Sequence, residues 1–76
     1  MNHAYIMINT DVGSESKVTK DLNKIDEVKE VYGVYGVYDL IVKVEAETME
    51  KLKTTISDNI RTIENIRTTL TMIVMD

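Results

Sequence analysis

Residues branched at Cβ dominate this sequence and gather in separate segments, which constrains the fold more than any other feature. Valine, isoleucine and threonine each occur nine times among the 76 residues. Such side chains pack well on a pleated surface and favour strands. Their segments predict four strands, at residues 4–9, 28–34, 38–45 and 66–75. A short gap centred on Gly36 joins the second strand to the third as a hairpin.

Two stretches between these strands carry apolar residues at helical spacing instead. The first begins at Ser14, whose hydroxyl is placed to cap the helix, and the second begins near Thr48. The apolar residues recur three or four positions apart, at Val18, Leu22 and Ile25, and again at Met49, Leu52, Ile56, Ile60 and Ile63. The order β-α-β-β-α-β with right-handed crossovers predicts a ferredoxin-like α+β plait. We expect one domain over residues 1–76, with a four-stranded antiparallel sheet and both helices on one face.

The sheet face turned away from the helices is expected to be apolar as well. Strict alternation assigns to the helix side Ile6, Ile8, Leu40, Val42, Val44, Leu70, Met72 and Val74. The open side then receives Tyr5, Met7, Val31, Ile41, Thr69, Thr71, Ile73 and Met75. A patch of this kind marks an interface, and a small domain without disulfides gains stability from a partner. The pattern therefore predicts a homodimer whose interface contains Tyr5, Met7, Val31, Ile41, Ile73 and Met75.

Composition and motifs argue against several kinds of function. The formal net charge is −4, with nine basic against 13 acidic residues, which disfavours binding to a nucleic-acid backbone. No apolar run is long enough to span a membrane and no basic leader starts the chain, so we expect a cytoplasmic location. Cysteine is absent, and the single histidine, His3, is not spaced to activate a serine. We therefore expect no catalytic residue, no metal and no cofactor.

The segment from Tyr32 to Asp39 is the most distinctive stretch, with three of the four tyrosines and two of the three glycines. One interpretation is an ordinary hairpin with aromatic cross-strand pairs. In the other, the Asp39 carboxylate meets a ligand ammonium group, while turn N–H groups and tyrosine hydroxyls meet a ligand carboxylate. Thr69 and Thr71 either present two hydroxyls to a ligand or are simply strand-forming residues.

The hairpin and the last strand together resemble a known family. Gly36-x-Tyr38-Asp39-Leu40 and Thr69-x-Thr71-x-Ile73-Val74-Met75 are similar to the C-terminal effector domain, called RAM, of the Lrp/AsnC transcription regulators. The resemblance covers nearly the whole chain, and the helix-turn-helix of those regulators has no counterpart in it. It implies dimers with facing sheets that assemble into rings, commonly octamers of four dimers. It also implies a small effector, usually an amino acid, bound between dimers.

The effector pocket implied by the resemblance contains Tyr35, Gly36, Tyr38, Asp39, Thr69 and Thr71. Two positions depart from the family pattern: Tyr35 replaces a small Ser or Thr, and Glu64-Asn65 replaces Pro-Gly before the last strand. The hypothesis is an amino-acid-sensing and oligomerising domain that also co-assembles with full-length Lrp/AsnC regulators, without contacting DNA itself. Two alternatives stay open: a small enzyme on the same plait, such as a monooxygenase or an isomerase, and an ACT-type amino-acid-binding domain, which typically has a glycine at the position of Gly13.

Overall fold

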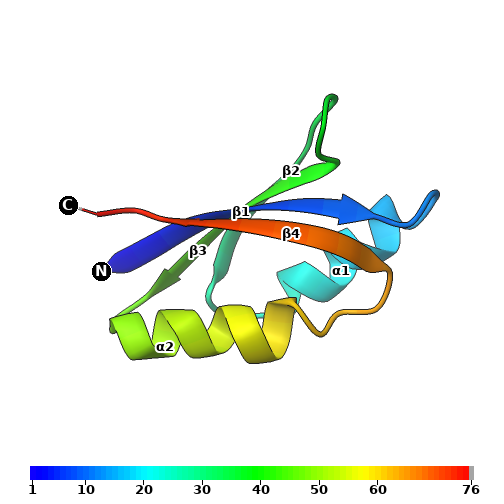
Figure 1. The fold of residues 1–76 in the computed structure, drawn as a ribbon. Helices are drawn as coiled ribbons and strands as arrows, with labels where there is room; N and C mark the ends of the chain where they lie inside the picture. The colour runs from blue at the N-terminus through cyan, green and yellow to red at the C-terminus, as the bar shows by residue number, and fades with distance from the viewer. Residues whose placement is uncertain (76) are drawn as a thin grey trace.

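The computed structural model describes residues 1–75, which form a four-stranded sheet with its helices on one face (Figure 1). The elements in chain order are β1 (Asn2–Thr10), α1 (Glu15–Asn23), β2 (Val28–Gly33), β3 (Leu40–Ala46), α2 (Met49–Thr54), a π-helical turn η1 (Thr55–Ile60) and β4 (Ile66–Ile73). The strands are antiparallel and lie in the order β2-β3-β1-β4. The predicted element order and the ferredoxin-like fold are thereby confirmed.

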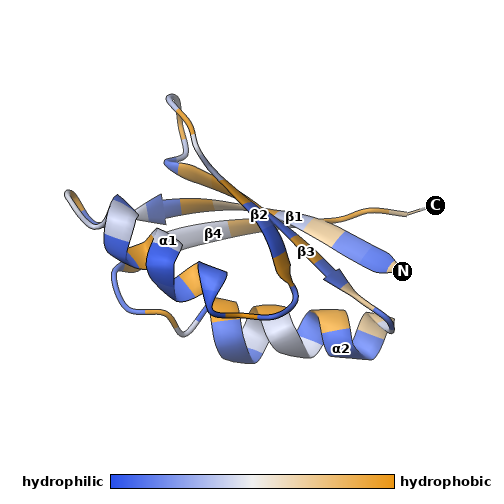
Figure 2. Ribbon diagram, turned by 180° about the vertical axis from the view of Figure 1, so that it is seen from behind, coloured by the Kyte–Doolittle hydropathy of each residue, from blue (hydrophilic) through white to orange (hydrophobic). Residues whose placement is uncertain are grey.

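The core lies between the sheet and the helices, and the alternation along β1 and β3 determines which residues fill it. Ile6 and Ile8 of β1 are fully buried, and so is Val42 of β3. Every second residue of β1 from Ala4 to Thr10 is buried, whereas the residues between them are half-buried. Each large aliphatic side chain buried in this way contributes roughly 1.5–3 kcal/mol. Coloured by hydropathy, the strands alternate between apolar and polar segments above the helices (Figure 2).

Helix α1 packs its predicted apolar stripe on the sheet, with Val18 and Leu22 fully buried. Its exposed side is stabilised by Lys17, whose ammonium group lies 3.1 Å from the Asp21 carboxylate one turn later. The predicted capping hydrogen bond to the Ser14 hydroxyl is absent. Ser14 occupies the capping position, but its hydroxyl accepts no hydrogen bond, because its backbone at φ −102° and ψ 4° is outside the extended conformation that capping residues adopt.

The second predicted helix is present but changes its geometry halfway along. Thr48 caps α2 by accepting a hydrogen bond from the Lys51 N–H at 3.0 Å. From Thr55 onward the chain widens into the π-helical turn η1, where the Arg61 N–H donates to the Ile56 carbonyl at 3.0 Å. The wider turn buries the adjacent residues Thr55 and Ile56 together.

The face assignment of β4 made from the sequence is wrong. Leu70 pairs with Met7 and therefore lies on the open face, as does Met72, whereas Ile73 pairs with Ala4 on the helix side. Thr69 and Thr71 pair with Ile8 and Ile6, so they also lie on the helix side. The physical reason is that β4 is an edge strand, so the helix side of its central part needs no large apolar side chains. Only its ends, Ile66 and Ile73, pack against the core.

The placement of Val31 on the open face is also wrong. The register between β2 and β3 shifts between Val28 and Glu30. This bulge adds one residue, so Val28 and Val31 both turn toward the helices, and both pack against the core. Of the six predicted interface residues, Tyr5, Met7 and Ile41 lie on the open face, and Met75 lies beyond the end of β4 with 92% of its surface exposed.

Candidate functional site

Asp39 is held at the base of the β2–β3 hairpin by contacts with β1. Its Oδ2 accepts hydrogen bonds from the Thr10 N–H at 2.9 Å and from the Thr10 hydroxyl at 3.4 Å. Its own N–H donates to the Ile8 carbonyl at 2.9 Å, and its carbonyl accepts from the Val34 N–H at 2.9 Å. Four contacts therefore fix the backbone and one carboxylate oxygen of Asp39. The sequence pointed to this residue for its charge, and the structure adds this positioning.

Two surface cavities meet at Asp39. One has a volume of about 370 Å³ and is lined by Glu15, Gly33, Val34, Tyr35, Asp39 and Leu40. The other has a volume of about 340 Å³ and lies at the end of β1, where Asp39 faces the β1–α1 loop and the start of β4. Both volumes are in the range of small-ligand sites. Asp39 is therefore the one predicted ligand-binding residue that belongs to both cavities.

The other predicted hairpin residues have different positions. Tyr35 lines the 370 Å³ cavity and is otherwise fully exposed. Gly36 is at the hairpin tip with φ +142°, a conformation that side chains rarely adopt. Tyr38 is half-buried and lines neither cavity. The hairpin stands clear of the sheet and helices (Figure 2), so its tip is open to a neighbouring molecule.

Thr69 and Thr71 are not brought to the hairpin within one protomer. Leu40 of β3 and Thr69 of β4 both pair with Ile8 of β1, which lies between them. Two inter-strand spacings, about 10 Å in all, therefore separate the hairpin base from Thr69. Thr69 lines a separate hollow beside β4, and Thr71 is exposed. A single pocket containing all six predicted residues is not present in one protomer.

The charged groups that share the 340 Å³ cavity with Asp39 were not predicted from the sequence. These are Arg67 from β4, Asp11 from the β1–α1 connection and Glu15 from the start of α1. The register between β1 and β4 shifts between Asn9 and Thr10, and Arg67 is the residue that this bulge leaves unpaired. The local sequence does not predict that bulge. The only available signal was the presence of charged residues on both sides of Gly13 and near the start of the last strand.

The departure at Glu64-Asn65 is accommodated by the turn before β4. Asn65 has φ +72°, a left-handed conformation that asparagine tolerates better than most residues. Its carbonyl accepts from the Asp11 N–H at 2.8 Å, and its side-chain amide donates to the Asp11 carboxylate at 3.1 Å. Asn65 therefore adopts the left-handed backbone conformation for which the family pattern has a glycine at this position. Its two hydrogen bonds to Asp11 tie this turn to the rim of the 340 Å³ cavity.

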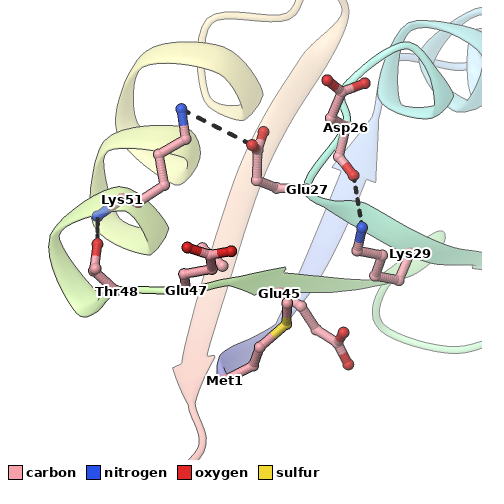
Figure 3. A pocket seen from close by; sticks show the side chains of 9 residues that line it. Met1, Asp26, Glu27, Lys29, Glu45, Glu47, Thr48 and Lys51 are labelled. Atoms are coloured by element: carbon pink, nitrogen blue, oxygen red, sulfur yellow. Dashed lines mark hydrogen bonds and ion pairs between the residues drawn. The ribbon is translucent and has the colours of Figure 1, made fainter.

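A third cavity, of about 380 Å³, lies near the N-terminus and the start of α2 (Figure 3). Both lysines that line it are already engaged by neighbouring residues. The Lys29 ammonium group donates to the Asp26 carbonyl at 3.0 Å, and the Lys51 ammonium group lies 3.9 Å from the Glu27 carboxylate. These contacts tie β2 and α2 to the loop after α1, so we assign this cavity a structural role.

The open sheet face is apolar at its centre and charged toward β2 and β3. Tyr5, Met7, Ile41, Leu70 and Met72 form the apolar part, which we call the open-face patch. Beside it, the Tyr32 hydroxyl donates to the Glu30 carboxylate at 2.7 Å, and this hydrogen bond raises the pKa of Tyr32. The Lys43 ammonium group lies 3.4 Å from the Glu45 carboxylate, and its hydrogen bond to that carboxylate raises the pKa of Lys43.

Within residues 1–75, no group of three or more His, Cys, Asp or Glu side chains is arranged to hold a metal ion. Over the same range, no helix is long and apolar enough to cross a bilayer.

The chain is thus a small α+β domain with a ferredoxin-like plait and two surface cavities that meet at the Asp39 carboxylate. The family model described as the Lrp/AsnC ligand-binding domain matches residues 3–76. The chain therefore belongs to the Lrp/AsnC ligand-binding domain family, as the hairpin and last strand suggested. No match was found among curated proteins.

Solved structures agree with the family assignment. The crystal structure of FFRP-DM1 is 45% identical with a TM-score of 0.94, and the alignment covers 99% of this chain and 100% of that one. A hypothetical protein from Pyrococcus horikoshii, PHS023, is 45% identical with a TM-score of 0.93, covering 99% and 90%. E. coli AsnC is 28% identical with a TM-score of 0.90, covering 99% of this chain and 51% of AsnC. The family and AsnC connect this fold with effector binding in transcription regulation rather than with an enzyme reaction.

Proposed function

We propose that this chain binds a free amino acid as an effector and thereby modulates transcription regulators of its own family. The observation that carries the proposal is the position of Asp39. Its carboxylate is held by β1 at the point where two cavities meet, in a domain whose family is defined by ligand binding. A carboxylate with one oxygen already positioned is a suitable acceptor for an ammonium group. This supports amino-acid binding over the enzymatic alternative, and the family match supports an Lrp/AsnC domain over the ACT type.

Assembly is part of the same proposal. The open-face patch favours association, since exposed apolar surface on a small domain marks an interface. Leu70 and Met72 remain 45% and 42% exposed in one protomer. A dimer formed through this patch leaves the hairpins free to contact further dimers. Rings such as octamers would then bring Thr69 and Thr71 of one protomer toward the hairpin of another and complete the pocket that the resemblance implies.

Regulation would follow from shared assembly in the cytoplasm. Domains that present the same open-face patch can exchange with the effector domains of full-length Lrp/AsnC regulators. An effector-loaded copy of this chain would then change the assembly of the regulator without contacting DNA itself. The test is a pull-down of tagged full-length regulator with this chain, with and without the effector, using the Leu70→Asp variant as the control that disrupts the patch.

Effector binding is tested by a thermal-shift screen of the twenty amino acids, followed by calorimetry. A ligand at 100 times its Kd should stabilise the domain by about 2.7 kcal/mol. Asp39→Asn retains an acceptor oxygen for Thr10 but loses the charge, so binding should weaken by about tenfold or more. Asp58→Asn, which changes an exposed carboxylate of η1, is the matched control. Stabilisation by none of the amino acids would contradict the proposal.

A further inference from the structure

The 340 Å³ cavity at the end of β1 is lined by an arginine and by Asp39, whose carboxylate is fixed by Thr10. Arg67 lies in β4 and Asp39 lies just before β3, two strands that are not neighbours in the sheet. Among residues 1–75, the Arg67 side chain makes no ion pair or hydrogen bond. Its planar fork of donors matches the geometry of a carboxylate. The cavity can therefore meet both charged ends of a free amino acid.

The bulge in β4 is a second observation that points to Arg67. Asn9 pairs with Thr68 and Thr10 pairs with Ile66, so Arg67 is the extra residue between them. Bulges redirect a side chain out of the regular alternation, and they occur often beside binding sites. Thr10, across from this bulge, is also the residue that holds the Asp39 carboxylate. One irregularity in the sheet thus positions both groups.

The remaining charges around the cavity are negative. Asp11 and Glu15 line it in addition to Asp39, so three carboxylates stand against the single guanidinium of Arg67. The Asp11 carboxylate is held by the Asn65 amide at 3.1 Å, whereas within the described residues the Glu15 side chain makes no hydrogen bond or ion pair. A net negative wall attracts a ligand of positive charge and repels one of negative charge.

We propose that this cavity binds a basic α-amino acid, whose α-carboxylate and α-ammonium groups are both held by one protomer. Its carboxylate lies on Arg67, its α-ammonium group lies on Asp39, and its cationic side chain lies toward Glu15 and Asp11. The inference rests on the proposed function and names the ligand class and its anchoring residues. Arg67 is then the residue that recognises a free carboxyl group, and Glu15 contributes to the choice of side chain.

Calorimetry at low ionic strength tests both parts with four probes: lysine, lysinamide, leucine and glutamate. Measurement near pH 6 keeps the α-amino group charged, since such groups titrate at about 7.7–8.0. Lysine should bind more tightly than leucine, and leucine more tightly than glutamate. Lysine should also bind more tightly than lysinamide by about tenfold or more, the size expected for a charge-assisted bidentate contact.

Variants of Arg67 and Glu15 then show which residue produces the preference for lysine over lysinamide and which produces the preference for lysine over leucine. Arg67→Gln should bring the affinities for lysine and lysinamide close together, and Arg67→Lys should retain part of the difference. Lys53→Gln removes an exposed charge on α2 and should leave the ratio unchanged. Glu15→Gln should reduce the preference for lysine over leucine by about threefold, as expected for one partly screened charge. Circular dichroism of each variant checks that the fold is intact.

The outcomes separate this inference from the proposed function. If leucine or glutamate binds best, the domain still senses amino acids, but the assignment to basic ligands is overturned. If Arg67→Gln leaves the ratio of lysine to lysinamide affinity unchanged while the fold is intact, Arg67 is not the carboxylate anchor. If wild-type protein binds no amino acid at all, the proposed function fails and this inference fails with it.

Discussion

Thr55 provides a direct test of how this small core is built. Its side chain is fully buried, and within the described residues its hydroxyl has no hydrogen-bond partner. A buried polar group without a partner costs roughly 1–3 kcal/mol, because it gives up its bonds to water. Valine has nearly the same shape without the hydroxyl, and its helix propensity is close to that of threonine. Thr55→Val should therefore raise the free energy of unfolding by about 1–2 kcal/mol.

This difference in the free energy of unfolding is large enough to measure by urea unfolding or by thermal unfolding, each followed by circular dichroism. For a domain of this length, 1 kcal/mol corresponds to a shift in Tm of roughly 4–8 °C. Wild type and variant must be compared at equal protein concentration, because association also stabilises the folded state. Thr55→Ser is the control: it keeps the hydroxyl but removes a buried methyl group, so it should lose about 0.5–1.5 kcal/mol. A Thr55→Val protein no more stable than wild type would show that the hydroxyl is hydrogen-bonded and would refute the reasoning.

Three further predictions address the open face, the hairpin and titration. Leu70→Asp places a charge in the open-face patch and should shift sedimentation at micromolar concentration from dimer to monomer. Gly36→Ala should lower the free energy of unfolding by about 1–3 kcal/mol in thermal melts, because φ is +142° and only glycine adopts this conformation easily. Ultraviolet titration should show the Tyr32 phenol ionising above its ordinary pKa, and Glu30→Gln should remove this shift. Since the folded-state pKa is raised, the stabilisation is complete below the ordinary pKa near 10 and is lost as pH rises through the raised value.

Matched control variants distinguish these specific effects from a general loss of folding. Thr71→Asp changes an exposed residue on the helix side of the same strand and should leave the dimer intact, whereas the face assignment from alternation expects the reverse. Gly33→Ala introduces the same methyl group at a glycine without positive φ, where nothing lies within 4 Å, so it should be nearly neutral. A tyrosine titration curve unaffected by Glu30→Gln would contradict the assigned hydrogen bond.

The hairpin site was partly predictable from the sequence, and the part that was not depends on pairing between distant strands. Asp39 stood out because a carboxylate directly after a glycine-rich turn is a local pattern. Arg67 did not, because its position depends on a bulge formed only when β4 pairs with β1. Thr69 and Thr71 were assigned to a pocket by resemblance, and within one protomer β1 separates them from the hairpin.

The sequence by itself determined the order of the elements, the fold and the core residues of β1, β3 and both helices. Those features follow from hydrophobic period, which each segment carries within its own residues. Only the tertiary structure decided which faces of β2 and β4 are buried, where η1 widens and which charges meet around Asp39. For β2 the physical reason is a bulge of one residue, which reverses the side of every residue beyond it and forms only where the partner strand determines. For β4 it is the position at the edge of the sheet, where the helix side of the strand needs no large apolar side chains.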